Sequence, residues 1–200
     1  MGDAPIRAGV LAVQGDFAAH AEALASLGAE VREVRGPADL DGLDCLVLPG
    51  GESTTISMGM ERDGLDAAVR EIHELGVPVM GSCAGMILAD REHLGLGDYV
   101  CRRNAFGRQV ASFERDLSVR GLGEEPLRAV FIRAPWVEEA GAGVEVLAEL
   151  DGHPVAVRDG SLLAVAFHPE LTEDTRIHAL FMAMATAHLA GEASARNEAR

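Results

Sequence analysis

Short apolar runs alternate with segments of helical spacing over the first 80 residues. Apolar runs bounded by polar turns predict buried strands, and they occupy residues 7–14, 31–34, 44–48 and 77–80. Apolar positions that repeat every three or four residues predict helices over residues 16–27, ended by Gly28, and about 53–75, capped by Ser53 or Thr54 and ended by Gly76. Because strands and helices alternate, we expect a mostly parallel central sheet with helices on both faces.

The pattern changes between residues 97 and 160, where Gly, Pro and charged turns separate short strand candidates. These candidates lie at residues 109–113, 128–132, 144–150 and 154–157, and they predict additional antiparallel strands. Residues 161–167 form another buried strand, and 174–189 carry the apolar stripe of a closing helix. We therefore expect a three-layer α/β fold in a single domain over residues 1–190. Residues 191–200 are polar, Ala-rich and terminal, which predicts a frayed tail.

Composition fits a globular protein with one core. The chain has 200 residues, of which 48% are hydrophobic. Its net charge of −15 argues against a nucleic-acid partner, since phosphate binding needs a basic face. The longest apolar stretches are shorter than the ~20 residues of a membrane span, and residues 1–8 lack the form of a signal peptide. We expect a cytoplasmic protein without a membrane partner.

All 17 basic residues are arginine. Without lysine the chain cannot form Schiff bases, build the phosphate-binding P-loop or use a lysine as general base. Three cysteines, an odd and small number, argue against a disulfide framework, so each thiol is interpreted alone. Cys45 and Cys101 lie in apolar, strand-like runs and are expected to be small buried hydrophobes. The histidines lack a metal-ligand spacing, so no metal site is expected.

Cys83 lies where a buried strand runs directly into a helix, with Gly81 and Gly85 two residues to either side. Such a nucleophile elbow raises the side chain above the sheet edge. The start of the new helix also directs its amides and positive dipole end at the sulfur, which favours the reactive thiolate. Taken alone, the same string also fits an inert buried cysteine in a strand-to-helix turn.

His168 follows the apolar strand 162–167 and therefore lies at a carboxyl edge, where α/β sheets build their sites. Glu170 comes two residues later, so in extended backbone both side chains would point the same way. Glu170 could then orient the imidazole while the other ring nitrogen faces Cys83. Alone, a His-Pro-Glu string also fits an ordinary helix start. The other histidines are assigned to surface or satisfied packing positions: His20, His73, His93, His153, His178 and His188.

A third strand, residues 46–48, ends in a loop of Pro49, Gly50 and Gly51 that opens a helix. Glycines let backbone amides approach a ligand, so the amides of Gly51 and Ala84 are candidates for an oxyanion hole. Alone, this loop also fits a plain glycine turn. Three such strings at three strand ends, in the order Cys, His and Glu, favour a nucleophilic enzyme with Cys83, His168 and Glu170 as its triad.

These residues resemble the class I, or triad, glutamine amidotransferases, whose elbow cysteine and His-x-Glu pair match Cys83, His168 and Glu170. Longer blocks resemble one branch of that class, the family of glutaminase subunits of pyridoxal 5′-phosphate synthase. The blocks span nearly the whole chain and comprise residues 13–15, 48–55, 103–109, 131–135 and 167–172.

The resemblance implies glutamine as substrate and assigns binding roles to particular positions. Arg103 suits the substrate carboxylate, because a guanidinium can bond two oxygens at once; without the resemblance it would equally fit a surface ion pair. The implied glutamine-binding positions are Gly51, Glu52, Ser53, Arg103, Ile132 and Arg133, with Gln14 and Asn104 near the oxyanion region.

The resemblance also implies the reaction and the partner. Cys83 would attack the glutamine amide, His168 would protonate the departing ammonia, and water would release glutamate. A synthase subunit would receive the ammonia and condense it with a pentose phosphate and a triose phosphate. Pyridoxal phosphate would be the product of that complex, so this chain would need no cofactor. The missing lysines agree, because imine chemistry would belong to the other chain.

Other families share parts of the pattern. The amidotransferase subunit of imidazole glycerol phosphate synthase would have the same triad, but the blocks at 103–109 and 131–135 speak against it. In enzymes of the dienelactone hydrolase type the acid precedes the histidine, and in the related cysteine peptidase-like family a histidine directly follows the cysteine, where this chain has Ala84. A non-catalytic scaffold subunit is a further alternative, which the intact triad disfavours.

Overall fold

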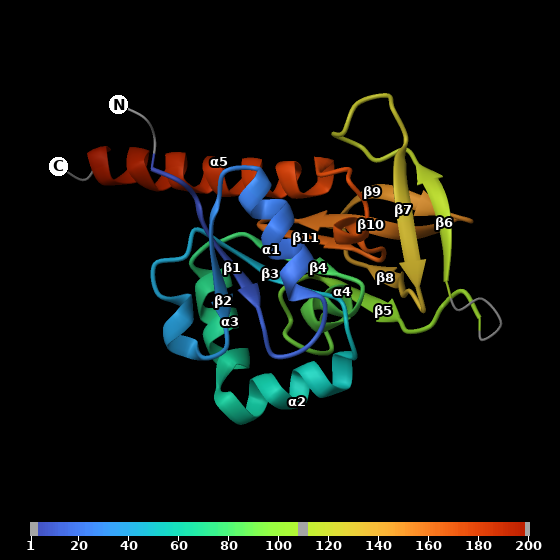
Figure 1. Cartoon of the computed structure of the whole chain (residues 1–200), viewed down its shortest axis with the longest axis horizontal. Helices are drawn as coiled ribbons and strands as arrows, with labels where there is room; N and C mark the ends of the chain where they lie inside the picture. Colours follow the sequence, from blue (N-terminus) through green and yellow to red (C-terminus); the bar gives the residue numbers. More distant parts are fainter. Residues whose placement is uncertain (1–3, 108–111, 199–200) are drawn as a thin grey trace.

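The computed structural model describes residues 4–107 and 112–198. In this part of the chain, a seven-stranded sheet forms the centre of the molecule (Figure 1). Five strands are mutually parallel where they pair, and β10 and β9 extend the sheet as antiparallel strands. The order across the sheet is β2 (Glu30–Val34), β1 (Arg7–Leu11), β3 (Cys45–Leu48), β4 (Val79–Ser82), β11 (Leu162–Val165), β10 (His153–Asp159) and β9 (Glu145–Leu150).

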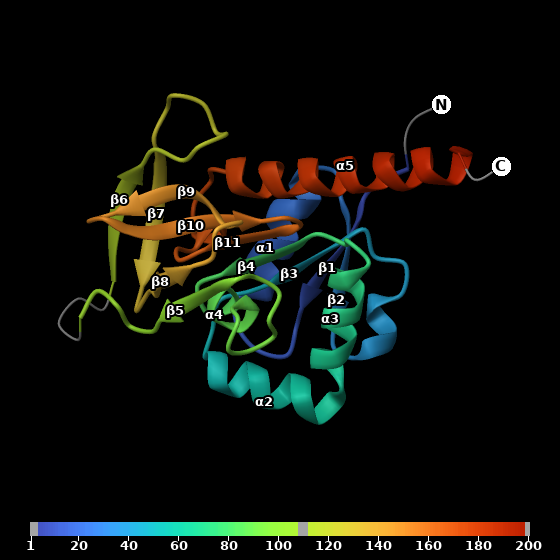
Figure 2. The same cartoon turned by 180° about the vertical axis from the view of Figure 1, so that it is seen from behind.

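Helices cover both faces of the sheet. One face carries α1 (Phe17–Ser26) and α5 (Arg176–Glu198), and the other carries α2 (Ser53–Asp63), α3 (Leu65–Glu74) and α4 (Ala84–Ala89) (Figures 1 and 2). Two short 3-10 helices, η1 (Pro37–Leu40) and η2 (Pro169–Leu171), complete the connections. No helix in the described ranges is both long and apolar enough to cross a membrane.

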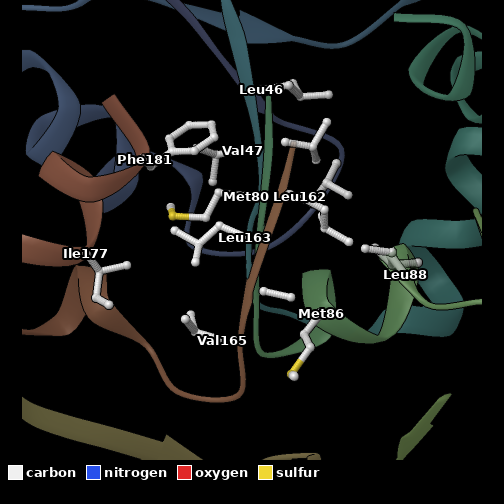
Figure 3. Packing of buried hydrophobic residues seen from close by; sticks show 14 of the residues in the cluster. Leu46, Val47, Met80, Met86, Leu88, Leu162, Leu163, Val165, Ile177 and Phe181 are labelled. Carbon is white, nitrogen blue, oxygen red and sulfur yellow. The ribbon is translucent and has the colours of Figure 1, made fainter. Parts of the chain in front are cut away.

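The core is filled from both faces, because neighbouring residues of a strand point to opposite sides. Val47 and Leu163 face α5, where they lie near Ile177 and Phe181 (Figure 3). Leu46 and Leu162 point to the other face, which also holds Met86 and Leu88 of α4 (Figure 3). All eight side chains are buried, so the central strands read as continuous apolar runs, as in other sheets covered on both sides.

Two further strand pairs lie at the end of the molecule that carries β9 and β10, and β8 packs against β10 (Figure 2). β5 (Tyr99–Arg102) pairs with β8 (Trp136–Ala140), and β6 (Ser112–Leu117) pairs with β7 (Leu127–Ile132), both antiparallel. The predicted fold class is thus confirmed, including the antiparallel additions. β5 agrees with the strand-like run expected around Cys101, whereas β8 was not expected from the pattern. Residues 109–111 of the predicted strand 109–113 lie outside the described ranges.

The helix predicted over residues 53–75 is wrong in two respects. It is divided into α2 and α3 at Gly64, whose φ of 71° is left-handed and ends α2. Its cap is Glu52, whose carboxylate accepts hydrogen bonds from the backbone N–H groups of Thr54 and Thr55. An acidic side chain at this end also interacts favourably with the helix dipole.

The predicted end of the closing helix is also wrong. α5 continues to Glu198, so most of the segment expected to fray is helical. Residues 190–198 are rich in Ala, Glu and Arg, which are strong helix formers, and they extend a helix already anchored on the sheet by Ile177 and Phe181. The polar composition reflects exposure: residues 191–195 are exposed and still helical.

Candidate active site

Three neighbouring parallel strands bring the predicted residues to one edge of the sheet. β4 lies between β3 and β11, with Gly81 paired to Leu48 and Ser82 paired to Val165. The chain leaves β4 through Cys83, leaves β3 through the Gly50–Gly51 loop and leaves β11 toward His168. Because the strands are parallel and in register, these three exits lie side by side, as the sequence predicted.

Cys83 has the strained backbone of a nucleophile elbow. Its φ of 48° and ψ of −103° are unusual for any residue other than glycine, and its N–H donates to Val165 O at 2.8 Å. Its flanking glycines are needed for packing, since a methyl group on Gly85 would collide with the carbonyl oxygen of Leu48. The side chain is buried, with Sγ 3.7 Å from Ile132 O.

His168 and Glu170 form a buried pair. Nδ1 of the imidazole lies 2.7 Å from Oε1 of the carboxylate, which leaves Nε2 as the nitrogen for another partner. Burial alone would lower the pKa of His168, but interaction with Cys83 and the hydrogen bond with Glu170 outweigh it and raise the pKa to about 10. The imidazole therefore carries both protons at neutral pH.

The backbone between these two residues differs from the expectation. Pro169–Leu171 forms the 3-10 turn η2 where extended backbone was assumed. The side chains still meet, because the turn brings Glu170 back beneath the imidazole. The prediction of the contact is therefore confirmed, and the reason given for it is wrong.

The glycine loop after β3 packs closely on the imidazole and on the first loop of the chain. Gly50 lies against both His168 and Cys83, so there is no room for a side chain. Gly51 has a φ of 151°, and Gln14 Oε1 accepts a hydrogen bond from the N–H of Glu52 at 3.3 Å. Gln14 thus holds the loop that carries one of the two predicted oxyanion-hole amides.

A cleft opens over Cys83, and all six positions to which the resemblance assigned glutamine binding line it, whereas Gln14 does not. Ile87 was not anticipated, because its position in α4 reads as ordinary core. The cleft is lined by Gly51, Glu52, Ser53, Cys83, Ala84, Ile87, Arg103, Asn104, Ile132 and Arg133.

The two arginines of the cleft differ in their contacts. Arg103 Nη2 lies 3.2 Å from both Glu52 Oε1 and Thr54 Oγ1, which ties it to the start of α2. Arg133 is exposed and, among the described residues, forms no ion pair. Arg133 and Asn104 both have a positive φ, 46° and 48°. Strained backbone at two positions of one cleft is typical of functional sites.

The comparisons with known proteins agree with this geometry. The model of the SNO glutamine amidotransferase family matches residues 10–187. The chain belongs to this family. A crystal structure described as a glutamine amidotransferase superposes with a TM-score of 0.85 at 48% identity, covering 90% of this chain and 98% of the other. PurLQS from Thermotoga maritima, with a TM-score of 0.69 at 18% identity, shares the fold.

Curated relatives of the family cover almost the whole chain. Pyridoxal 5′-phosphate synthase subunit PdxT of Frankia alni is 55% identical over 185 residues, 88% of this chain and 93% of the relative. The protein of the same name from Streptomyces coelicolor is 53% identical over 206 residues, 96% of this chain and 99% of the relative. The family resemblance inferred from the sequence motifs is thus confirmed.

An aromatic cluster supports the loop that carries two of the family's cleft residues, Arg103 and Asn104. Phe106 packs edge-on against Phe113 and Trp136, with ring centroids 5.1 and 5.2 Å away. The Arg103–Gln109 block that suggested the family continues into residues 108 and 109, which lie outside the described ranges. The sequence motif therefore marked the loop, but the packing of Phe106 became visible only in the structure.

Two histidines assigned to surface or packing positions contact the site. His20 and His178 are fully buried, and His20 Nε2 lies 3.2 Å from Glu170 Oε2. Both histidines lie on the buried faces of helices α1 and α5. That position in the pattern could have indicated burial, but not which residues each histidine contacts.

Proposed function

We propose that this chain is the glutaminase subunit of pyridoxal 5′-phosphate synthase, hydrolysing L-glutamine to L-glutamate and ammonia. The observation that carries the chemistry is a cleft with a strained cysteine beneath it and a buried His168–Glu170 pair beside that cysteine. The choice of synthase rests on the relatives named pyridoxal 5′-phosphate synthase subunit PdxT, whose sequences this chain matches over nearly their whole length.

The proposed reaction begins with attack of the Cys83 thiolate on the amide carbon of the glutamine side chain. The carbonyl oxygen becomes an oxyanion, which the amides of Gly51 and Ala84 stabilise. His168 donates a proton to the amide nitrogen, so the carbon–nitrogen bond breaks and ammonia leaves. The product at this stage is a glutamyl thioester on Cys83.

Water then attacks the thioester carbon. His168, neutral after its first proton transfer, takes a proton from this water, and the carbon–sulfur bond breaks to release glutamate and the thiolate. Glu170 holds the imidazole in one orientation through both steps, by the hydrogen bond at Nδ1. Cys83, His168 and Glu170 therefore act as a catalytic triad.

The cleft also offers groups for the amino-acid end of glutamine. Arg103 and Arg133 are exposed cations at its rim, and a guanidinium binds a carboxylate through two parallel hydrogen bonds. Gly51, Glu52, Ser53 and Ile132 form the remaining contacts in this proposal. Gln14 and Asn104 support the oxyanion region, the former through its bond to the loop of Glu52.

The ammonia must reach a second protein. In bulk water at neutral pH it would be protonated and no longer nucleophilic, so transfer to a synthase subunit must be direct. This chain holds no lysine with which to form an imine on a sugar phosphate, and the synthase supplies that lyase-type chemistry. We place the complex in the cytoplasm, where reducing conditions would keep Cys83 and the other free thiols reduced.

The test is to incubate the purified chain with glutamine, with and without the synthase subunit, and to measure glutamate. We expect turnover with the partner and, for Cys83→Ala, no turnover but unchanged complex formation. No glutamate from the wild-type complex would refute the enzyme and favour a non-catalytic scaffold. Residual turnover in Cys83→Ala would refute Cys83 as the nucleophile.

A further inference from the structure

The carboxylate of Glu170 lies between two imidazoles. Oε1 is bonded to His168, and Oε2 lies 3.2 Å from His20 Nε2. The side chains of Glu170 and His20 are both fully shielded from solvent. His20 Nε2 also lies 2.9 Å from Ser82 Oγ, the residue directly before Cys83. Through His20, helix α1 thus contacts Glu170 and Ser82.

The contact with Glu170 determines which nitrogen of His20 carries a proton. No hydrogen bond joins Nε2 to Oε2 among the described residues, but an ionised carboxylate 3.2 Å away repels a lone pair at Nε2 and attracts an N–H there. Nε2 therefore carries the proton and donates it to Ser82 Oγ, while the charge of Oε2 acts on the same N–H from 3.2 Å away. Nδ1 of His20 is then the acceptor of the ring.

A second buried imidazole fixes this arrangement. His178 Nε2 lies 3.0 Å from His20 Nδ1, so His178 must be the donor. Its own Nδ1 is then an unprotonated acceptor, and it has no hydrogen-bond partner among the described residues. The opposite arrangement would bury an unpaired N–H, which is rarer than an unpaired acceptor.

Both imidazoles remain neutral in this arrangement. Burial lowers the pKa of His20, an effect that the charge of Glu170 opposes. Burial also lowers the pKa of His178, to about 4. The charged or titratable groups that act on His20 are Glu170, His168 and Asp16, and the neighbouring His178 contacts it directly. A neutral donor can orient the carboxylate without neutralising it.

We propose that His20 is a positioning residue for the glutaminase reaction: its Nε2–H, held in that tautomer by His178, restrains Glu170 so that Oε1 stays on His168. This inference rests on the proposed function, because it assigns His20 an effect on a step that His168 performs. His20 contacts neither the cleft nor the reacting atoms. It acts through the two residues that it contacts, Glu170 and Ser82.

The test compares two variants in which an amide side chain, glutamine or asparagine, replaces His20. A glutamine reaches far enough to place its amide nitrogen near the position of Nε2, whereas an asparagine reaches only the position of Nδ1. We expect His20→Asn to lower kcat for glutamate release about 3- to 10-fold, less than the loss of one hydrogen bond to a charged group, because the contact with Oε2 is electrostatic and not a hydrogen bond. KM for glutamine should be unchanged. His20→Gln should recover most of kcat. Both are assayed in the complex with the synthase.

A matched control uses a histidine–carboxylate pair outside the site. His93 Nδ1 lies 2.7 Å from Oδ1 of the buried Asp90, and His93→Asn should leave kcat unchanged. An inactive wild type would overturn the proposed function, and this inference with it. If the wild-type complex is active and His20→Asn has the same kcat, this inference alone is overturned and the proposed function stands.

A second measurement separates positioning from a purely structural role and needs no partner. NMR titration of the His168 ring should give a lower pKa in His20→Asn than in wild type, and a pKa close to wild type in His20→Gln. Equal pKa values in all three chains would overturn the proposal. If His20→Asn does not fold, His178→Leu takes its place, because it removes the donor to Nδ1 and leaves His20 present. Unchanged kcat in that variant would then overturn the proposal.

Discussion

Gly50→Ala tests whether the position of His168 governs the rate. The φ of Gly50 is not left-handed, so alanine strains no backbone dihedral and the added methyl group is the only perturbation. That methyl would lie 2.5 Å from Cε1 and 3.0 Å from Nδ1 of His168, but 3.5 Å from Cβ of Cys83. The imidazole is therefore displaced, while the nucleophile keeps an ordinary contact.

The size of the effect follows from these distances. Ordinary van der Waals contact begins at 3.4 Å, so Cε1 must retreat by about 0.9 Å. A movement of that size disturbs the 2.7 Å bond between Nδ1 and Glu170 Oε1. Misplacement of a reacting group by about 1 Å can cost roughly 100-fold in rate. We expect kcat to fall by that order, with KM for glutamine nearly unchanged.

The assay is steady-state glutamate release by the complex with the synthase. Gly143→Ala is the matched control, because it adds the same methyl group where the nearest atom is 3.9 Å away. Thermal unfolding of both variants checks that the fold is retained. A Gly50→Ala complex with wild-type kcat would refute the argument that His168 acts from the position described.

Three further predictions concern Gly85, Arg103 and His178. Gly85→Ala should lower the free energy of unfolding by about 1–3 kcal/mol, measured in urea, because the methyl collides with the Leu48 backbone. Arg103→Ala should raise KM for glutamine about 10- to 100-fold with a smaller change in kcat, since one charged hydrogen bond to the substrate is lost. Stability should fall as pH drops from about 6.5 toward 4, because His178 has a folded pKa of about 4 and the unfolded chain binds the proton first. His178→Gln should flatten that part of the urea-denaturation profile, and an unchanged slope would contradict the assignment.

The sequence predicted the central sheet well, because its strands are apolar runs buried on both faces. It predicted β5 and β8 less well, since Tyr99–Arg102 and Trp136–Ala140 contain exposed polar residues and take their structure from pairing with each other. The break at Gly64 was also missed. One glycine within a helix costs only about 1 kcal/mol, so periodicity alone does not decide between a continuous helix and two helices.

The site residues divide in the same way: some could be predicted from local sequence pattern, and others depend on how distant elements pack together. Cys83, His168 and the Gly51 loop each follow a strand, and parallel strands place their carboxyl ends at one edge, so local pattern was enough to bring them together. His20 and His178 lie 158 positions apart on two helices. Their meeting depends on how α1 and α5 pack on the sheet, which no local pattern records.

The buried histidines also join the chemistry to the stability of the fold. Glu170 can be ionised in a solvent-free position only because polar groups compensate its charge. These groups are His168 directly before η2, His20 on α1 and, through His20, His178 on α5. Loosening any of these elements would leave a buried charge poorly compensated. It would also release the imidazole that the charge orients. Substitutions beneath the sheet edge should therefore lower stability and kcat together, whereas substitutions at the cleft rim, such as Arg103→Ala, should change KM and leave stability unchanged.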